Sequence, residues 1–386
     1  MNLYTNRRRS AAVVFRRCLV AVVAAGCVAE PALAARFCVA DATGFGAAVA
    51  AAQGNNDHNE ILLRQGVYVT PTGGWNLELG DRPHNLDIVG GYTDAGCTQR
   101  HADASLTVLD GANVARPLTI DTGGSVPGNG AHIRISGLTF RNGRGDFVGG
   151  LKVSDPGPIY GGTILIEGSI FRDNVAISGI FDTGPGGLLA ATDGPDFSGG
   201  TGLIVRNNVF VGNSGPNASA MFLFSNNQIE VANNTIVGNR CTGADLVERW
   251  SIRTYTFTGL HFSNNVFWGN NPAGLPDTYD LRLYAQNTNQ TTLTNNLIQA
   301  RIGTALAETG SLSTNPGFVD AGNGDYRPDA SSPLADAGSD ATAAGLMPTD
   351  VAGNARVAGA RVDIGAYERA AAPADPIFTG GFEAVD

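Results

Sequence analysis

Six segments of the chain share one alternating pattern, and this repetition limits the fold more than any other feature of the sequence. The segments begin at His132, Thr163, Gly202, Gln228, Gly259 and Thr291. Each segment leads to an apolar residue of one column, which contains Phe140, Phe171, Phe210, Ile236, Phe267 and Ile298. Further apolar residues stand five and seven positions earlier in most repeats, and this period of two is typical of a strand with one buried face.

Successive members of the column are 31, 39, 26, 31 and 31 residues apart. A unit of this size built from short strands cannot enclose a core of its own, so it must stack on its neighbours. The repeats lack the helical periodicity of ankyrin and tetratricopeptide arrays, and most are shorter than a propeller blade of about 40 residues. The pattern therefore predicts an all-β parallel β-helix, a solenoid whose strands pair with the coils above and below.

Asparagine stands two positions before the apolar column in four successive repeats, at Asn208, Asn234, Asn265 and Asn296. Asparagine tolerates the left-handed backbone of a tight turn, and its amide can bond to an identical amide one coil away. We therefore expect a turn with a stacked amide ladder at this position.

Shorter runs that begin at Gly149, Gly186, Ser219 and Tyr279 are predicted to form a second strand in each coil. We expect Leu151, Leu188 and Leu281 to point into the core. The neighbouring residues then face outward in one column, which contains Lys152, Leu189 and Arg282.

Residues 1–34 are predicted to be a secretory signal peptide. Arg7, Arg8, Arg9, Arg16 and Arg17 form a basic region, residues 18–29 an apolar region, and residues 32–34 a small-x-small cleavage site. The apolar region is too short for a transmembrane helix, which needs about 20 residues. The expected location is secreted or at the cell surface, in an extracellular or periplasmic compartment. An alternative is that Cys27 carries a lipid, because residues 24–27 resemble a lipoprotein box.

The remaining chain is predicted to divide into a β-helix at 35–323, a capping region at 324–369 and a disordered tail at 370–386. Residues 41–53 place Phe45, Val49 and Ala52 at helical spacing, so this segment is expected to be a short helix that covers the first coil. The capping region is rich in turn residues and is expected to cover the last coil irregularly.

Three cysteines lie beyond the predicted signal peptide, namely Cys38, Cys97 and Cys241. In an oxidising compartment an odd number implies one disulfide and one free thiol. Cys38 and Cys97 flank the first predicted strands, so we expect them to pair and Cys241 to remain free. No cysteine and histidine cluster with zinc-ligand spacing is present.

The charge of the chain argues against nucleic acid as a partner. The full chain has a formal charge of −10 from 25 basic and 35 acidic residues. Cleavage after residue 34 removes five basic residues and one acidic residue, so 20 and 34 remain and the net charge becomes −14. A phosphate backbone binds basic surfaces, and a chain this acidic is not expected to offer one overall.

The chain resembles the right-handed parallel β-helix proteins of the pectin-lyase-like superfamily. The resemblance rests on the repeated NNxFxGN segments, on ILLRQGVY at 61–68 and on GGYTDAGC at 90–97. Residues 324–338 and 350–368 resemble the C-terminal module of bacterial secreted β-helix proteins of the choice-of-anchor Q type. The resemblance covers about residues 36–369 and implies a right-handed solenoid. It leaves the activity open, because the superfamily includes lyases, hydrolases and adhesins.

Several enzyme classes lack their motifs in this chain. The Gly-His-Gly and Arg-x-Lys motifs of β-helical galacturonases are absent, and no Gly-x-Ser-x-Gly elbow occurs. The five histidines are scattered and do not form a zinc-ligand pattern. We expect His132 and His261, which lie at strand starts, to be ordinary surface residues.

A polysaccharide lyase is the remaining enzymatic hypothesis. Such an enzyme removes a proton beside a uronate carboxylate with a basic residue, often with Ca²⁺ as a charge-neutralising ion. Lys152, the only lysine, would be the base, and Asp146 and Asp155 would bind calcium. Additional positive charge would come from neighbouring repeats through Arg141, Arg144 and Arg172.

Two functions follow from these observations. The favoured hypothesis is a secreted, non-catalytic protein that binds a polysaccharide or a cell-envelope glycan, with unknown catalytic and metal residues. The alternative is a divergent polysaccharide lyase that acts on uronate glycans through Lys152. Calcium is the one cofactor left open.

Overall fold

The computed structural model describes residues 34–55, 58–80, 85–121, 132–154, 163–178, 184–192, 201–243, 250–256, 258–270, 279–283 and 290–369. The predicted tail at 370–386, and the predicted signal peptide apart from its last residue, lie outside these ranges. Both predictions therefore remain untested.

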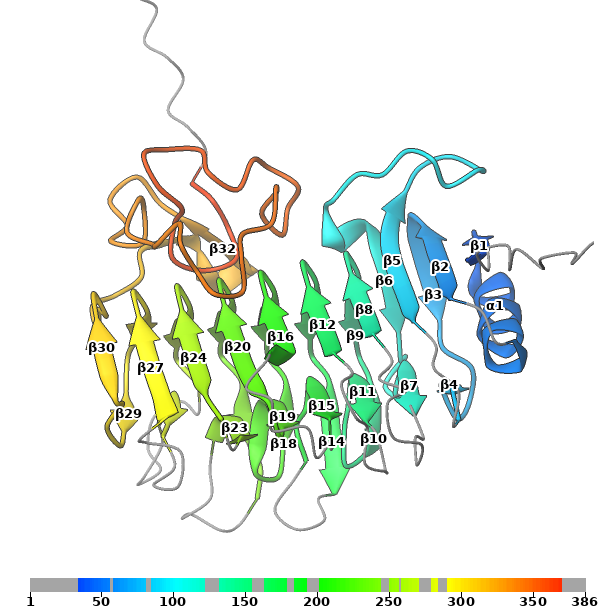
Figure 1. Ribbon diagram of the computed structural model, residues 1–386, viewed down its shortest axis with the longest axis horizontal. Helices are drawn as coiled ribbons and strands as arrows, with labels where there is room; N and C mark the ends of the chain where they lie inside the picture. The colour runs from blue at the N-terminus through cyan, green and yellow to red at the C-terminus, as the bar shows by residue number, and fades with distance from the viewer. Residues whose placement is uncertain are drawn as a thin grey trace, which may run out of the picture. The chain divides into compact units, whose positions relative to one another are not determined.

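Strands from successive coils lie side by side and pair in parallel in four sheets (Figure 1). Among the described residues, sheet A contains β1 (Ala35–Val39), β2 (Asn59–Arg64), β5 (Leu86–Tyr92), β8 (His132–Ser136), β12 (Thr163–Glu167), β16 (Thr201–Arg206), β20 (Gln228–Ala232), β24 (Leu260–Ser263), β27 (Thr291–Thr294) and β30 (Ala307–Thr309). Sheet B contains β3 (Gly66–Val69), β6 (Thr107–Asp110), β9 (Thr139–Arg141), β13 (Ile170–Arg172), β17 (Val209–Val211), β21 (Thr235–Val237), β25 (Val266–Trp268) and β28 (Leu297–Ile298).

Two further sheets complete the coils. Sheet C contains β4 (Trp75–Glu78), β7 (Leu118–Asp121), β11 (Leu151–Ser154), β15 (Leu188–Thr192), β19 (Ala218–Ser225) and β23 (Trp250–Thr256). Sheet D contains the short strands β10 (Arg144–Asp146), β14 (Val175–Ser178), β18 (Ser214–Gly215) and β22 (Arg240–Cys241). Along the chain, a complete coil passes through sheets A, B, D and C in that order, as β12, β13, β14 and β15 do. This topology confirms the predicted parallel β-helix.

The apolar column of the repeats forms the inward face of sheet B. Pairing aligns Phe140, Phe171, Phe210, Ile236, Phe267 and Ile298 in neighbouring strands. The ring centroids of Phe171 lie 5.0 Å from Phe140 and 4.6 Å from Phe210, and adjacent rings are nearly parallel. Phe210 and Phe267 are fully buried, as the repeat pattern predicts.

The predicted amide ladder is present at the turn between sheets A and B. The Nδ2 atoms of Asn208, Asn234 and Asn265 each donate to the Oδ1 of the next asparagine, at 3.0, 2.9 and 2.9 Å. Each of these Nδ2 groups also donates to a carbonyl of the coil behind, for example from Asn234 to Val205 at 2.8 Å. Because all four asparagines are fully buried, these bonds satisfy polar groups that would otherwise be costly.

The backbone of the ladder differs from the expectation in one respect. The left-handed conformation belongs to the preceding residue, with φ of 57° at Asn207, 55° at Asn233, 56° at Asn264 and 50° at Asn295. The first asparagine of each pair therefore makes the turn, and the second makes the ladder.

A second amide ladder, which the sequence analysis missed, follows sheet B. Asn174, Asn213 and Asn239 donate from Nδ2 to the Oδ1 of the next asparagine in the series, each at 2.9 Å. The series ends at the buried Asn270, whose Nδ2 donates to Asp280 at 3.0 Å. The repeat NNxFxGN thus contains a turn residue, a ladder residue, a core aromatic, a second turn residue and a second ladder residue.

The N-terminal end of the core is covered by α1 (Ala42–Gly54), as predicted (Figure 1). Asp41 caps this helix, because its side chain accepts a hydrogen bond from the backbone N–H of Gly44 at 2.7 Å. Phe45 is fully buried and makes an edge contact with Trp75, with ring centroids 4.8 Å apart. The helix thus closes the first coil with apolar side chains.

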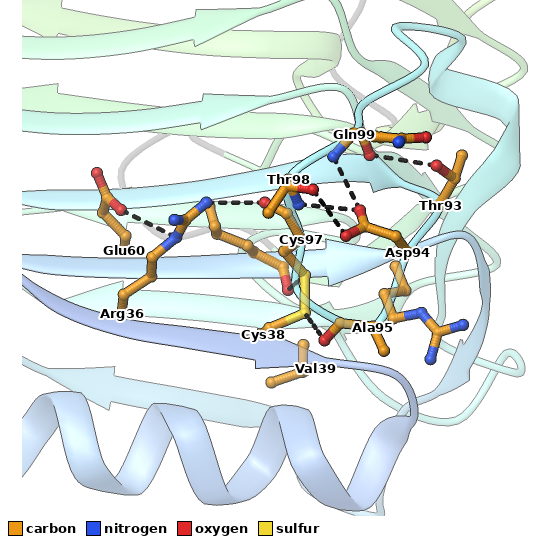
Figure 2. The surroundings of a disulfide bond; sticks show 12 residues. Arg36, Cys38, Val39, Glu60, Thr93, Asp94, Ala95, Cys97, Thr98 and Gln99 are labelled. Carbon is orange, nitrogen blue, oxygen red and sulfur yellow. Dashed lines mark hydrogen bonds and ion pairs between the residues drawn. A yellow bond between two sulfur atoms is a disulfide. The ribbon is translucent and has the colours of Figure 1, made fainter.

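The predicted disulfide joins Cys38 on β1 to Cys97 in the loop after β5 (Figure 2). Cys241 is buried outside this disulfide, as predicted, and its Sγ donates to the carbonyl of Trp250 at 3.0 Å. Arg36 donates to the carbonyl of Cys97 at 2.7 Å. In the same loop the carboxylate of Asp94 accepts from the backbone N–H groups of Thr98 and Gln99 at 2.9 and 2.8 Å. The disulfide therefore ties the first strand of sheet A to an already ordered loop.

The region 324–369 was expected to cover the last coil, whereas its described contacts run along the side of several coils (Figure 1). It follows β31 (Phe318–Asp320) and the 3-10 turn η3 (Ala321–Asn323), and it begins with β32 (Asp325–Pro328). The turn residues Asn207, Asn264 and Asn295 donate from Nδ2 to carbonyls of this region at 3.2, 2.9 and 2.7 Å. Their left-handed backbone leaves these amides outside the core, where they hold the C-terminal region.

Candidate functional site

Lys152 lies in the middle of sheet C, on the outward side of β11. Pairing places it between Thr119 on β7 and Leu189 on β15, and its side chain is half-buried. Arg116 donates to the hydroxyl of Thr119 at 3.0 Å and to the carbonyl of Val148 at 3.0 Å, and burial lowers its pKa. Arg116 is thus a cation close to the Lys152 strand that sequence reasoning did not select.

The arginines proposed to assist Lys152 belong to other sheets. Arg141 and Arg172 lie side by side in sheet B, where Arg141 pairs with Asp110 at 2.8 Å and Arg172 with Asp173 at 3.0 Å. Arg144 is exposed on β10 in sheet D. The hypothesis that Arg141 and Arg172 add positive charge beside Lys152 does not fit this arrangement, because both belong to sheet B and each contacts a carboxylate of its own.

The predicted calcium ligands are only partly described. Asp146 is exposed, and its Oδ1 accepts a hydrogen bond from the hydroxyl of Ser178 at 3.0 Å. Asp155 lies outside the described residues. In the described part of the chain, no three His, Cys, Asp or Glu residues come together as a metal site.

The outward column that contains Lys152 also differs from the prediction. Beyond Leu189, pairing continues to Phe222 on β19 and Arg253 on β23. Arg282 belongs to β26 (Leu281–Arg282), which pairs with β29 (Arg301–Ile302) in a separate small sheet. The runs in sheet C were aligned without an internal marker such as asparagine, so their register could not be derived from the sequence.

Sheet A carries a charged cluster on its outward face, centred on Glu167. The Oε1 of Glu167 is 2.7 Å from the guanidinium of Arg134, and its Oε2 is 2.7 Å from that of Arg206. The Glu167 side chain is only 3% exposed, whereas Arg206 is 20% and Arg134 is 38% exposed. Arg206 also donates to the carbonyl of Ala344 in the C-terminal region. A buried carboxylate thus fixes two guanidinium groups that reach the surface.

A third arginine joins this cluster from the loop after β5. Arg100 donates from Nε to the carbonyl of Gly90 at 2.8 Å and from Nη2 to the hydroxyl of Ser136 at 3.2 Å. Desolvation lowers the pKa of Arg100, and the nearby charge of Arg134 lowers it further. The Nη1 groups of Arg100 and Arg134 bond to no described residue. Arg100, Arg134, Glu167 and Arg206, which we call the arginine cluster, thus carry a net charge of +2.

Glu230 and His261 lie further along the same face, on β20 and β24. Glu230 is 2% exposed, its Oε2 has no hydrogen-bond partner among the described residues, and burial raises its pKa to about 7. His261 contacts the hydroxyl of Thr292 at 2.6 Å and lies 4.0 Å from Glu230, and desolvation lowers its pKa. The prediction that His261 is an ordinary surface residue is wrong, because it is half-buried and faces a buried carboxyl group.

The sequence contains a signal for these residues. In the aligned repeats, the positions four and six residues before the apolar column face outward from sheet A. Arg134, Glu230 and His261 occupy the earlier position, and Glu167 and Arg206 the later one. Charged residues at these two outward positions of neighbouring repeats therefore indicate contacts between coils.

Comparison with known proteins adds little to this geometry. The chain matches no protein-family profile and no curated protein sequence. It is similar to a solved structure described as the crystal structure of pectate lyase Pel9A, with 16% sequence identity and a TM-score of 0.28. The alignment covers 84% of this chain and 90% of that chain. A likeness this distant carries no inference about activity, so the fold assignment rests on the strand pairing. No helix in the described residues has the length and apolarity to cross a membrane.

Proposed function

We propose that this chain is a secreted protein that binds an acidic, uronate-containing polysaccharide through the arginine cluster on sheet A. The observation that carries the proposal is the imbalance of charge at this site. Two guanidinium groups bond to a single buried carboxylate, and a third, that of Arg100, lies near them. Arg100 and Arg134 each keep N–H groups that bond to no described residue. The proposal concerns binding and assigns no catalytic step.

Guanidinium groups match the geometry of carboxylates. An arginine can donate two parallel hydrogen bonds to one carboxylate, and such charge-assisted bonds are stronger than neutral ones. Glu167 holds Arg134 and Arg206 in place before a ligand arrives, which reduces the entropy that binding must overcome. A uronate polymer offers one carboxylate per sugar, so neighbouring units can meet Arg100 and Arg134.

The negative charge of the whole chain directs an acidic polymer to the arginine cluster. The full chain has a formal charge of −10, so an acidic polymer is repelled by most of the surface. The arginine cluster, with its net charge of +2, attracts it to one face of sheet A, where Asp87, which pairs beside Arg134, contacts His58 at 2.9 Å. Because part of this attraction is between exposed charges, binding is expected to weaken as salt screens them.

The proposal is tested by measuring affinity for oligogalacturonate and for a neutral dextran by calorimetry. Arg100→Gln and Arg134→Gln are each expected to weaken oligogalacturonate binding about tenfold, which corresponds to about 1.4 kcal/mol. Arg144→Gln is the matched control, because it removes an exposed arginine from sheet D and is expected to change the affinity less than twofold.

Arg134→Gln also removes a partner from the buried Glu167, so its fold is checked by circular dichroism and thermal unfolding. Arg100→Gln leaves both bonds to Glu167 intact and is the cleaner variant. Equal binding by wild type, Arg100→Gln and Arg144→Gln would contradict the proposal. Equal affinity for dextran and oligogalacturonate would contradict it as well.

A further inference from the structure

A cavity of about 350 Å³ lies beside the last coil, several coils after those that carry the arginine cluster. It is lined by Ile298, Gln299, Arg301, Glu308, Ser311, Leu312 and Ser313. Cavities that hold small molecules usually begin at about 300 Å³, so this one can hold a ligand the size of a single sugar ring.

Ile298 lines the cavity from the side of the core. It is the last member of the buried column in sheet B and is only 6% exposed. The backbone of Leu312 lies beside it, because the N–H of Leu312 donates to Asn296 and its carbonyl accepts from Ile298, at 2.7 and 2.8 Å. The two side chains lie on opposite faces, because Ile298 packs in the core and Leu312 packs against Val266 and Leu297.

The rim of the cavity is polar and has no net charge. The guanidinium of Arg301 on β29 lies 2.8 Å from the carboxylate of Glu308 on β30. The Oγ of Ser311 is buried without a hydrogen-bond partner among the described residues. The Oε1 of Gln299 accepts from the backbone N–H of Gly269 at 2.7 Å, which fixes the direction of its amide. The lining of the cavity is therefore mainly polar and offers both donors and acceptors.

We propose that this cavity binds one uncharged sugar unit through the hydroxyl groups of the sugar. These hydroxyl groups both donate and accept hydrogen bonds, which matches the polar lining of the cavity. Arg301 can donate a hydrogen bond to a sugar hydroxyl group, and Glu308 can accept one. The Ser311 hydroxyl, which has no partner among the described residues, would gain a hydrogen bond. An anion would face Glu308 and a cation would face Arg301, so a neutral ligand fits best.

This inference goes beyond the proposed function and does not depend on it. The test records amide chemical shifts of the full protein during titration with sugars. The neutral ligands are the methyl glycosides of glucose, galactose, mannose and N-acetylglucosamine. The anionic ligand is the methyl glycoside of galacturonic acid with its carboxylate free, called methyl galacturonate below. At least one neutral glycoside is expected to shift the amide signals of residues 298–313. Ser311→Leu fills the cavity and is expected to weaken this binding at least tenfold, whereas Thr309→Ala, an exposed change on β30, is expected to leave it unchanged.

One further variant separates the outcomes. Glu308→Gln keeps the size of the cavity but removes the charged acceptor, and it is expected to weaken neutral-sugar binding while oligogalacturonate affinity stays the same. The proposal is overturned if no neutral glycoside shifts these signals, if methyl galacturonate binds more tightly than every neutral glycoside, or if Ser311→Leu binds as well as wild type. Loss of oligogalacturonate binding in Arg100→Gln alone tests the arginine cluster and leaves this site unaffected.

Discussion

Truncation of Asn234 to alanine tests the role of the amide ladder in holding the coils in register. The Oδ1 of Asn234 accepts from the N–H and the Nδ2 of Asn208, both at 3.0 Å. Its Nδ2 donates to the carbonyl of Val205 at 2.8 Å and to Asn265 at 2.9 Å. Asn234→Ala removes all four bonds in a fully buried environment.

The loss in the free energy of unfolding depends on which hydrogen bonds the neighbouring groups keep after Asn234→Ala. The backbone N–H of Asn208 loses its acceptor, and an unsatisfied buried donor costs about 1–3 kcal/mol. The other three bonds contribute about 0.5–1.5 kcal/mol each, because the Nδ2 of Asn208 still bonds to Ile166 and Asn265 still accepts from the backbone of residue 234. The expected loss is therefore about 2.5–7.5 kcal/mol in urea unfolding followed by circular dichroism.

The control is Asn76→Ala, which removes an exposed asparagine on β4 and is expected to change stability by less than about 0.5 kcal/mol. A loss below about 1 kcal/mol for Asn234→Ala, with an unchanged denaturant slope, would refute the reasoning. It would mean that strand pairing alone holds the coils in register.

Three further predictions concern the core, the buried carboxyl group and the lysine. Phe210→Ala is expected to cost about 3–5 kcal/mol in the same assay, because it leaves a cavity beside Phe171, and a loss below about 1 kcal/mol would contradict the core assignment. Burial raises the pKa of Glu230 to about 7, so the folded state holds a proton between about pH 4.5 and 7 that the unfolded state releases, and stability falls as pH rises through this range. The free energy of unfolding of Glu230→Gln should therefore exceed that of the wild type at pH 8 by an amount on the order of 3 kcal/mol. If the wild type instead gains stability relative to the variant between pH 5 and pH 8, Glu230 is not neutral in the folded protein. Lys152→Ala should change oligogalacturonate affinity less than about threefold, and an eliminase activity of the wild type that this variant loses would establish the lyase hypothesis instead.

The sequence contained most of the information about the fold because the repeats mark their own register. Asn208, Asn234 and Asn265 are locked to an apolar residue two positions later, so one alignment predicts the turn, the ladder and the core column together. The final asparagine of NNxFxGN marks the second ladder in the same way, at Asn213, Asn239 and Asn270. Sheet C lacks such a marker, and the outward neighbour of Leu189 proved to be Phe222 rather than a residue of the Tyr279 run.

The candidate site was less predictable than the fold because its residues come from different coils and loops. Arg134 and Glu167 are 33 positions apart, and their contact depends on the pairing of β8 with β12. Arg100 reaches the cluster from a loop whose path a strand pattern does not define. The lyase hypothesis relied on proximity in sequence, but proximity in a solenoid depends on the sheet, and Arg141 and Arg172 lie in sheet B while Lys152 lies in sheet C.

The central claim, that an acidic glycan binds to the outward face of sheet A, is tested most directly by hydrogen–deuterium exchange of the wild-type protein with and without oligogalacturonate. The account predicts slower exchange in peptides that contain Arg100, Arg134 and Arg206, with little change in β11 and β15 of sheet C. Protection confined to the strands around Lys152, or no protection at a concentration that saturates binding, would contradict it.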